Sequence, residues 1–111
     1  NVYCNTPSAF AQDPMALALA QEAVARGVLK ELTPDERAFL LLPYMHSESP
    51  LIHVEAERLY REWAPENNHK FELRHKEIID RFGRYPHRNR ILNRESTAEE
   101  LEFLKQPGSS F

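Results

Sequence analysis

Apolar residues recur along much of the chain at the spacing of three and four residues that is typical of a helix with one buried face. In segments 50–63 and 68–82 this spacing is regular, and charged residues fill many of the positions between the apolar ones. The apolar series are Ile52, Ala56, Leu59 and Trp63 in the first segment and Phe71, His75, Ile78 and Phe82 in the second. No segment bounded by turn residues sustains the alternation of a strand. The pattern predicts an all-α fold of successive antiparallel helix pairs joined by short loops.

Start and stop signals divide the chain into about five predicted helices. The helices are predicted to begin at Asp13-Pro14, Thr33-Pro34, Ser49-Pro50, Asn67 or Asn68, and Ser96 or Thr97, and the first four to end near Gly27, Pro43, Pro65 and Gly83. Thr33 and Glu36 have the spacing of a capping box. The run 39–42 is apolar on every side, so its short helix is predicted to lie in the centre of the fold. A further short turn is predicted to start at Pro86 and to end at a left-handed Asn93.

Length and composition restrict the class of protein. The 111 residues are 41% hydrophobic, which predicts a single helical domain over residues 1–111. A net charge of −3 argues against a general nucleic-acid binder. The single cysteine, Cys4, cannot form an internal disulfide, and no Cys/His spacing of a metal site occurs, so neither a metal nor a cofactor is predicted. The apolar runs are too short to cross a bilayer and no segment resembles a signal peptide, which predicts a cytoplasmic protein without a membrane partner.

Positive charge is concentrated in residues 81–97, which contain five of the ten arginines and carry +4, although the whole chain carries −3. Such segregation predicts either an anion site or a salt-bridge seam with the acidic helices. The predicted ligand-binding residues are Arg81, Arg84, His87, Arg88 and Asn89. Forked arginine donors and the N–H groups that follow Pro86 would hold a phosphate or carboxylate there. In the alternative, Arg84 and Arg88 fix the corner between helices by internal pairing. Their candidate partners are then Glu48, Glu95 and Asp80.

Four polar residues are candidates for acid–base catalysis if the fold brings them together, namely His46, Glu48, His75 and His87. His75 also ends the series Glu72-Leu73-Arg74-His75, which has the E-x-x-H spacing of di-iron helical bundles. That chemistry requires such a motif on each of two facing helices together with two further inward glutamates, and His75 is predicted instead to be a hydrogen-bonded core histidine. His53 and His69 are predicted to lie on solvent faces.

The segments LTPDERAFLLLPYMHSE, RHKEIIDRFGRYPHRNRILNREST and PGSSF, together with NVY near the start, resemble the bacterial domain of unknown function 924 family over essentially the whole chain. The resemblance implies a helical fold similar to tetratricopeptide-like repeats, in a family without an assigned activity. It also implies that residues 1–111 are the C-terminal portion of a longer family domain, without the upstream helices. An apolar face on the first two helices is then expected to bind a second copy of the chain or a complementary N-terminal fragment. Asn93 stands where the family has glycine, and no change of fold is expected from it.

These patterns leave two hypotheses of function. In the first, the chain is a helical module that binds a protein partner or a small anion at its Arg/His corner. In the second, it is an enzyme that acts on a small anionic metabolite, which arginines orient while histidine or glutamate transfers a proton. The enzyme hypothesis requires the polar residues to line one cavity that solvent can reach, whereas internal salt bridges would plug the corner in a purely structural role.

Overall fold

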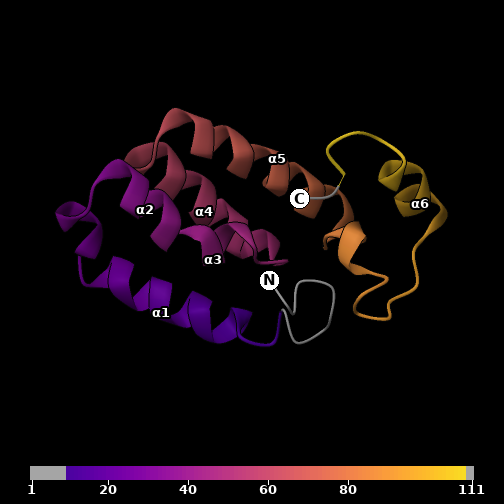
Figure 1. Cartoon of the computed structure of the whole chain (residues 1–111), viewed down its shortest axis with the longest axis horizontal. Coiled ribbons are helices and arrows are strands. Elements are labelled where there is room, and N and C mark those ends of the chain that lie inside the picture. The colour runs from indigo at the N-terminus through magenta and orange to yellow at the C-terminus, as the bar shows by residue number, and fades with distance from the viewer. Residues whose placement is uncertain (1–9, 110–111) are drawn as a thin grey trace.

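The computed structural model describes residues 10–109, which form six α-helices, two short 3-10 helices and no strand (Figure 1). In order they are α1 (Asp13–Ala25), η2 (Val28–Glu31), α2 (Pro34–Leu40), α3 (Leu42–Met45), α4 (Pro50–Trp63), α5 (Glu66–Phe82), η3 (Pro86–Arg88) and α6 (Ala98–Leu104). The predicted all-α fold is confirmed. The resemblance to tetratricopeptide repeats stays a prediction.

The centre of the fold is the antiparallel pair of α4 and α5, which only two residues, Ala64 and Pro65, connect. In Figure 1 these helices lie side by side, α1 packs on the other side of α3, and α6 lies beyond the C-terminal end of α5. A large apolar cluster fills the space between α1, α2, α3 and α4. It consists of Ala20, Leu29, Ala38, Leu41, Tyr44, Met45, Ala56, Leu59 and Tyr60. Its alanines allow the helix backbones to approach closely, and the Tyr60 hydroxyl donates a hydrogen bond to the Ala38 carbonyl at 3.1 Å.

A second, smaller apolar cluster attaches α6 to the end of α5. Ile78, Ile79 and Tyr85 form its buried part, and the rings of Phe82 and Phe103 pack against them with centroids 5.0 Å apart. Polar side chains, described below, occupy the space between the two clusters. The segment that follows α5 is therefore anchored by polar contacts on one side and by aromatic contacts on the other.

The local signals of helix ends are largely confirmed. Thr33 and Thr97 each complete a capping box, and the Ser49 hydroxyl accepts from the Ile52 N–H. Gly27 and Gly83 are left-handed, with φ of 77° and 71°. The predicted N-cap at Asp13 is wrong by one residue, because α1 begins at Asp13 itself and the preceding Gln12 makes no side-chain cap. Asp13 therefore lies in the first turn, where the helix dipole favours a carboxylate.

Three predictions of burial are wrong. Phe39 is 77% exposed, because the short helix α2 buries Ala38 and the neighbouring Leu41 instead. Phe71 is 53% exposed, because the buried face of α5 is displaced by one residue and contains Glu72. His53 was expected in solvent and is fully buried in α4. The last two errors have one cause, because the buried side chains of His53 and Glu72 form a hydrogen bond with each other inside the fold.

Met15 and Leu19 are exposed on α1, as is Phe39 on α2. Apolar side chains are thus present on the outer surface of the first two helices, and the association expected from them stays a prediction. None of the helices within residues 10–109 is long and apolar enough to cross a membrane.

Asn93 allows a direct test of the backbone between η3 and α6. It has φ of 57°, and among residues 10–109 it is the single residue other than glycine with a positive φ. We expect Asn93→Ala to lower the free energy of unfolding by about 1 kcal/mol, because a Cβ without a local polar group disfavours the left-handed region. Asn93→Gly is the matched control and should change stability by less than about 0.5 kcal/mol. Urea unfolding measures both, and equal stability of the two variants would contradict the expectation.

Candidate functional site

Glu48, in the loop between α3 and α4, joins this loop to the segment that follows α5. Its two carboxylate oxygens each accept a hydrogen bond at 3.0 Å from the Arg94 guanidinium, and one also accepts from the Tyr85 backbone N–H at 2.7 Å. Burial raises the pKa of this carboxyl, but the hydrogen bonds from Arg94 and Tyr85 outweigh burial and leave the pKa below its ordinary value. Glu48 is therefore ionised and accepts three hydrogen bonds.

Arg84 and Arg81 connect the end of α5 to α6. The Arg84 guanidinium donates to both carboxylate oxygens of Glu100, at 2.8 and 2.6 Å, and to the Glu95 carbonyl at 2.8 Å. Arg81 donates to Glu99 at 2.9 Å on the surface. The Arg84 hydrogen bonds lower the pKa of Glu100 to about 2. These two arginines thus hold α6 in place rather than open a pocket.

A buried polar network joins α4, α5 and Tyr85. His53 Nε2 lies 2.6 Å from the Ser47 carbonyl oxygen and 3.0 Å from the Tyr85 hydroxyl, and its Nδ1 lies 3.1 and 2.9 Å from the two carboxylate oxygens of Glu72. Because a carbonyl only accepts, Nε2 carries a proton, and a second proton must lie between Nδ1 and the carboxylate. The Tyr85 hydroxyl donates in turn to the Met45 carbonyl. Burial raises the pKa of Glu72, which favours retention of the shared proton.

Three histidine rings surround the Tyr85 ring, with centroid distances of 6.1 Å for His53, 5.7 Å for His75 and 5.9 Å for His87. Burial lowers the pKa of His75 to about 4, so this ring is neutral at physiological pH. His75 Nδ1 lies 2.7 Å from the Phe71 carbonyl one turn earlier, as expected of a hydrogen-bonded core histidine. Within residues 10–109 no three His, Cys, Asp or Glu side chains are arranged to hold a metal ion, so the E-x-x-H spacing has no metal-binding counterpart there.

Arg88 differs from the other arginines of segment 81–97. Its side chain is 9% exposed, and the nearest carboxylate oxygen, on Glu48, is 4.0 Å from Nη1, which is too long for a hydrogen bond. Its buried Nε has no hydrogen-bond partner among residues 10–109, and no residue in this range accepts from its guanidinium. The guanidinium carbon lies 4.4 Å from the centroid of the Phe10 ring and 4.9 Å from that of Tyr85. Burial lowers the pKa of Arg88, as expected of a cation that few acceptors solvate.

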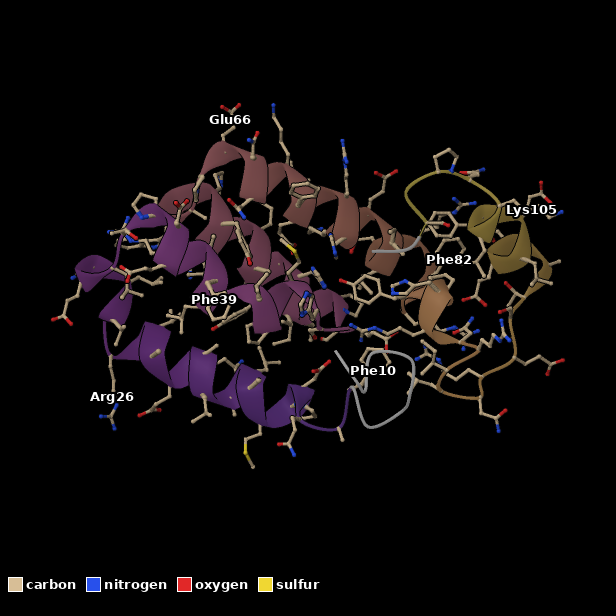
Figure 2. All side chains as sticks on the ribbon, viewed as in Figure 1. Phe10, Arg26, Phe39, Glu66, Phe82 and Lys105 are labelled. Atoms are coloured by element: carbon tan, nitrogen blue, oxygen red, sulfur yellow. The ribbon has the colours of Figure 1, made fainter. Side chains whose placement is uncertain are left out.

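A cavity of about 270 Å³ lies beside Arg88, between the start of α1, the α3–α4 loop and η3. Figure 2 places Phe10 at the N-terminal end of α1, next to the segment that follows α5. The lining residues are Phe10, Asp13, Pro14, Leu17, Pro43, His46, Ser47, Glu48, Arg88 and Leu92. Burial among these neighbours lowers the pKa of His46, and the positive charge of Arg88 lowers it further. The cavity therefore combines one buried cation, a neutral imidazole, the carboxylates of Asp13 and Glu48, and apolar walls.

The structure brings together only some of the predicted site residues. Arg88 and the acid–base candidates His46 and Glu48 line this cavity. The others are placed elsewhere in the corner: Arg81 and Arg84 pair with α6, His75 and His87 contact Tyr85, and Asn89 is buried with its amide group bonded to Ser96 and Arg94.

Sequence reasoning missed Arg94, which holds Glu48, and Asp13, which lies in the cavity wall. Arg94 could have been suspected from the concentration of charge, but nothing in its spacing distinguished it from Arg88. The role of Asp13 had no signal beyond its place before a proline.

The Arg84–Glu100 pair predicts a dependence of stability on pH. The pKa of Glu100 is lowered from 4.5 to about 2, so its contribution is complete above pH 4.5 and is lost as the pH falls towards 2. We expect Glu100→Gln to lower the free energy of unfolding at pH 7 by on the order of 2 kcal/mol, after allowance for solvent screening. Since the glutamine keeps the capping position, the difference from the wild type should shrink near about pH 3.

Urea unfolding at the two pH values measures this effect. Glu99→Gln is the control, because its ion pair with Arg81 is exposed and should contribute less than about 1 kcal/mol. A Glu100→Gln deficit that does not change with pH would contradict the role of the pair.

The comparisons with known proteins identify relatives but no activity. No curated protein matches the chain. A solved structure of a protein of unknown function from Agrobacterium tumefaciens is 36% identical in sequence and superposes with a TM-score of 0.87. The match covers 93% of this chain and 58% of that protein, so the chain spans a little more than half the length of this relative. The family model described as bacterial protein of unknown function (DUF924) matches residues 1–108. The resemblance found in the sequence is therefore confirmed, and the chain belongs to this bacterial family of unknown function.

Proposed function

We propose that the chain binds a small anion, through a carboxylate or phosphate group, at Arg88 in the cavity between α1, the α3–α4 loop and η3. The observation that carries this proposal is the buried Arg88 guanidinium, whose Nε has no acceptor among residues 10–109 and which borders an open cavity. A charged donor left unsatisfied in this way costs on the order of 1–3 kcal/mol or more. A ligand that accepts hydrogen bonds from other N–H groups of the guanidinium would offset part of that cost.

The surroundings of Arg88 favour binding of an anion by the N–H groups of its guanidinium. The guanidinium carbon lies close to the rings of Phe10 and Tyr85, and such cation–π contacts stabilise its charge. These contacts do not use the N–H donors, from which no residue within 10–109 accepts a hydrogen bond. An arginine edge with parallel donors matches the two oxygens of a carboxylate or phosphate. Arg88 is thus suited to orient an anion in one direction.

The other arginines of the corner lack this availability. Arg84 is occupied by Glu100, and Arg94 is occupied by Glu48, each through two hydrogen bonds. Arg81 pairs with Glu99. The predicted anion pocket is therefore reduced in this proposal to Arg88, the buried arginine of segment 81–97 that has no carboxylate within hydrogen-bond distance among residues 10–109.

The second candidate is proton transfer on the bound anion. His46 lines the same cavity, and its lowered pKa keeps the imidazole neutral at physiological pH, which is the form that accepts a proton. Glu48 is less suited to this role, because Arg94 and the Tyr85 N–H occupy its oxygens. His75 and His87 are not among the residues that line this cavity. His46 is thus the residue to test if the bound molecule is found to react.

Arg88→Met separates a binding role from a structural one. We expect the variant to be as stable as the wild type within about 1 kcal/mol, or more stable, because the substitution removes a buried cation without hydrogen bonds to residues 10–109. Arg94→Met, which strands the half-buried Glu48, should lower stability by about 3 kcal/mol. Urea unfolding of both variants gives the comparison. A loss in Arg88→Met as large as that in Arg94→Met would mean that Arg88 is structural.

Binding is measured by calorimetric titration with isocaproate and with inorganic phosphate. We expect the wild type to bind at least one of them and Arg88→Met to weaken binding by at least about tenfold. Arg90→Gln is the matched control, since Arg90 is exposed and only two residues away. Equal binding by the wild type and Arg88→Met would refute the proposal.

A further inference from the structure

The charges inside the cavity define the ligand more closely. Resting on the proposed anion site, we infer that the ligand is a small zwitterion with an apolar body, of the class of the aliphatic α-amino acids. Its carboxylate binds Arg88, and its ammonium group binds Asp13. The geometry that points to this class is the presence of two opposite charges in one small cavity without an ion pair between them.

Asp13 is the second polar anchor. It lines the cavity from the first turn of α1. No residue within 10–109 donates a hydrogen bond to its carboxylate, and no cation in that range forms an ion pair with it. Its negative charge nevertheless acts on both Arg88 and His46. An aspartate in the first turn of a helix is common because of the helix dipole, so Asp13 alone indicates no site. Together with the buried Arg88 across the same cavity, it supplies the acceptor that an ammonium group requires.

Glu48 is a weaker candidate than Asp13 for the ammonium group, because the guanidinium of Arg94 offsets its charge. Its oxygens already accept two hydrogen bonds from Arg94 and one from the Tyr85 backbone. Among the charged groups that line the cavity, the available pair is therefore one cation, Arg88, and one carboxylate, Asp13. A ligand with one negative and one positive group matches this pair. A multiply charged phosphate ester would bring its excess negative charge close to Asp13 and Glu48.

The remaining walls determine the body of the ligand. Pro14, Leu17, Pro43 and Leu92 contribute apolar surface to the same cavity. The volume of about 270 Å³ lies just below the range of about 300–1,000 Å³ that is usual for drug-sized ligands. These dimensions favour a single amino acid with an aliphatic side chain over a nucleotide or a peptide.

The test compares three probes of the same carbon skeleton by calorimetric titration: L-leucine, isocaproate, which lacks the amino group, and isoamylamine, which lacks the carboxylate. We expect the wild type to bind L-leucine at least about tenfold more tightly than either partial analogue. Asp13→Asn should remove the advantage of L-leucine over isocaproate and leave the affinity for isocaproate unchanged or improved. Arg88→Met should weaken both.

Asp35→Asn is the matched control. Asp35 lies in the first turn of α2, as Asp13 lies in the first turn of α1, but it is not among the residues that line the cavity. This substitution therefore reproduces the loss of a favourable interaction with a helix dipole, and it should leave the affinity for L-leucine unchanged. Far-ultraviolet circular dichroism of each variant verifies that the helices are intact.

The outcomes distinguish the two proposals. If the wild type binds isocaproate or phosphate as tightly as L-leucine and Arg88→Met abolishes this binding, the anion site stands and the zwitterion is refuted. If Asp13→Asn leaves the preference for L-leucine intact, Asp13 is not the ammonium ligand and the inference fails in the same way. If none of these probes binds, both proposals fall.

Discussion

The bidentate contact between Arg94 and Glu48 is the interaction on which the rest of the corner depends. These residues are 46 positions apart in the chain, and the contact holds the α3–α4 loop against the segment that follows α5. Glu48 also accepts from the Tyr85 backbone N–H, so one carboxylate satisfies three donors. Its desolvation is therefore compensated by charge-assisted hydrogen bonds. The same carboxylate lies 4.0 Å from the Arg88 guanidinium, which is beyond hydrogen-bond distance. Among residues 10–109, Glu48 thus forms hydrogen bonds with Arg94 and not with Arg88.

Between the two apolar clusters, the interior of the fold contains the hydrogen-bonded network of His53, Glu72 and Tyr85. Its hydrogen bonds reach the carbonyl groups of Met45 and Ser47, which flank His46. Directional bonds of this kind fix a backbone more closely than apolar contacts do, since each donor has one acceptor position. They also fix the loop that presents His46 and Glu48 to the cavity. The polar interior is thus part of what positions the candidate site.

The sequence predicted those features that depend on neighbouring residues. The capping boxes at Thr33 and Thr97 and the left-handed Gly83 and Asn93 were recognised because their geometry involves only three or four consecutive positions. The exact buried face of α4 and α5 was not predicted. A histidine on one helix and a glutamate on another look like surface residues until the fold pairs them, as it pairs His53 of α4 with Glu72 of α5.

The choice of partner within the arginine-rich segment could not be predicted for a related reason. Charge segregation indicated that carboxylates of other segments would meet these arginines, and they do. Which arginine meets Glu48 is decided by the path of the backbone between Gly83 and Asn93, which no local pattern specifies. The sequence therefore indicated the segment that contains the proposed site, whereas Arg88 is distinguished within that segment by a buried Nε that has no hydrogen-bond partner among residues 10–109.

Arg88 is a buried cation without a carboxylate at hydrogen-bond distance among residues 10–109, an arrangement that is expected to lower the stability of the fold. Every other arginine of the corner that contacts a carboxylate does so within hydrogen-bond distance, at 3.0 Å or less, among the residues that the structure describes. Sequences usually agree with their folds at each level, and positions that break this agreement are concentrated at functional sites. A ligand that binds only the folded chain stabilises it by an amount that grows with its concentration, about 2.7 kcal/mol at a concentration of 100 times Kd. A ligand of modest affinity that binds in the cavity would therefore offset the free-energy cost of burying the Arg88 guanidinium without a hydrogen-bonded carboxylate. A role of Arg88 in binding therefore explains its burial better than a purely structural role does.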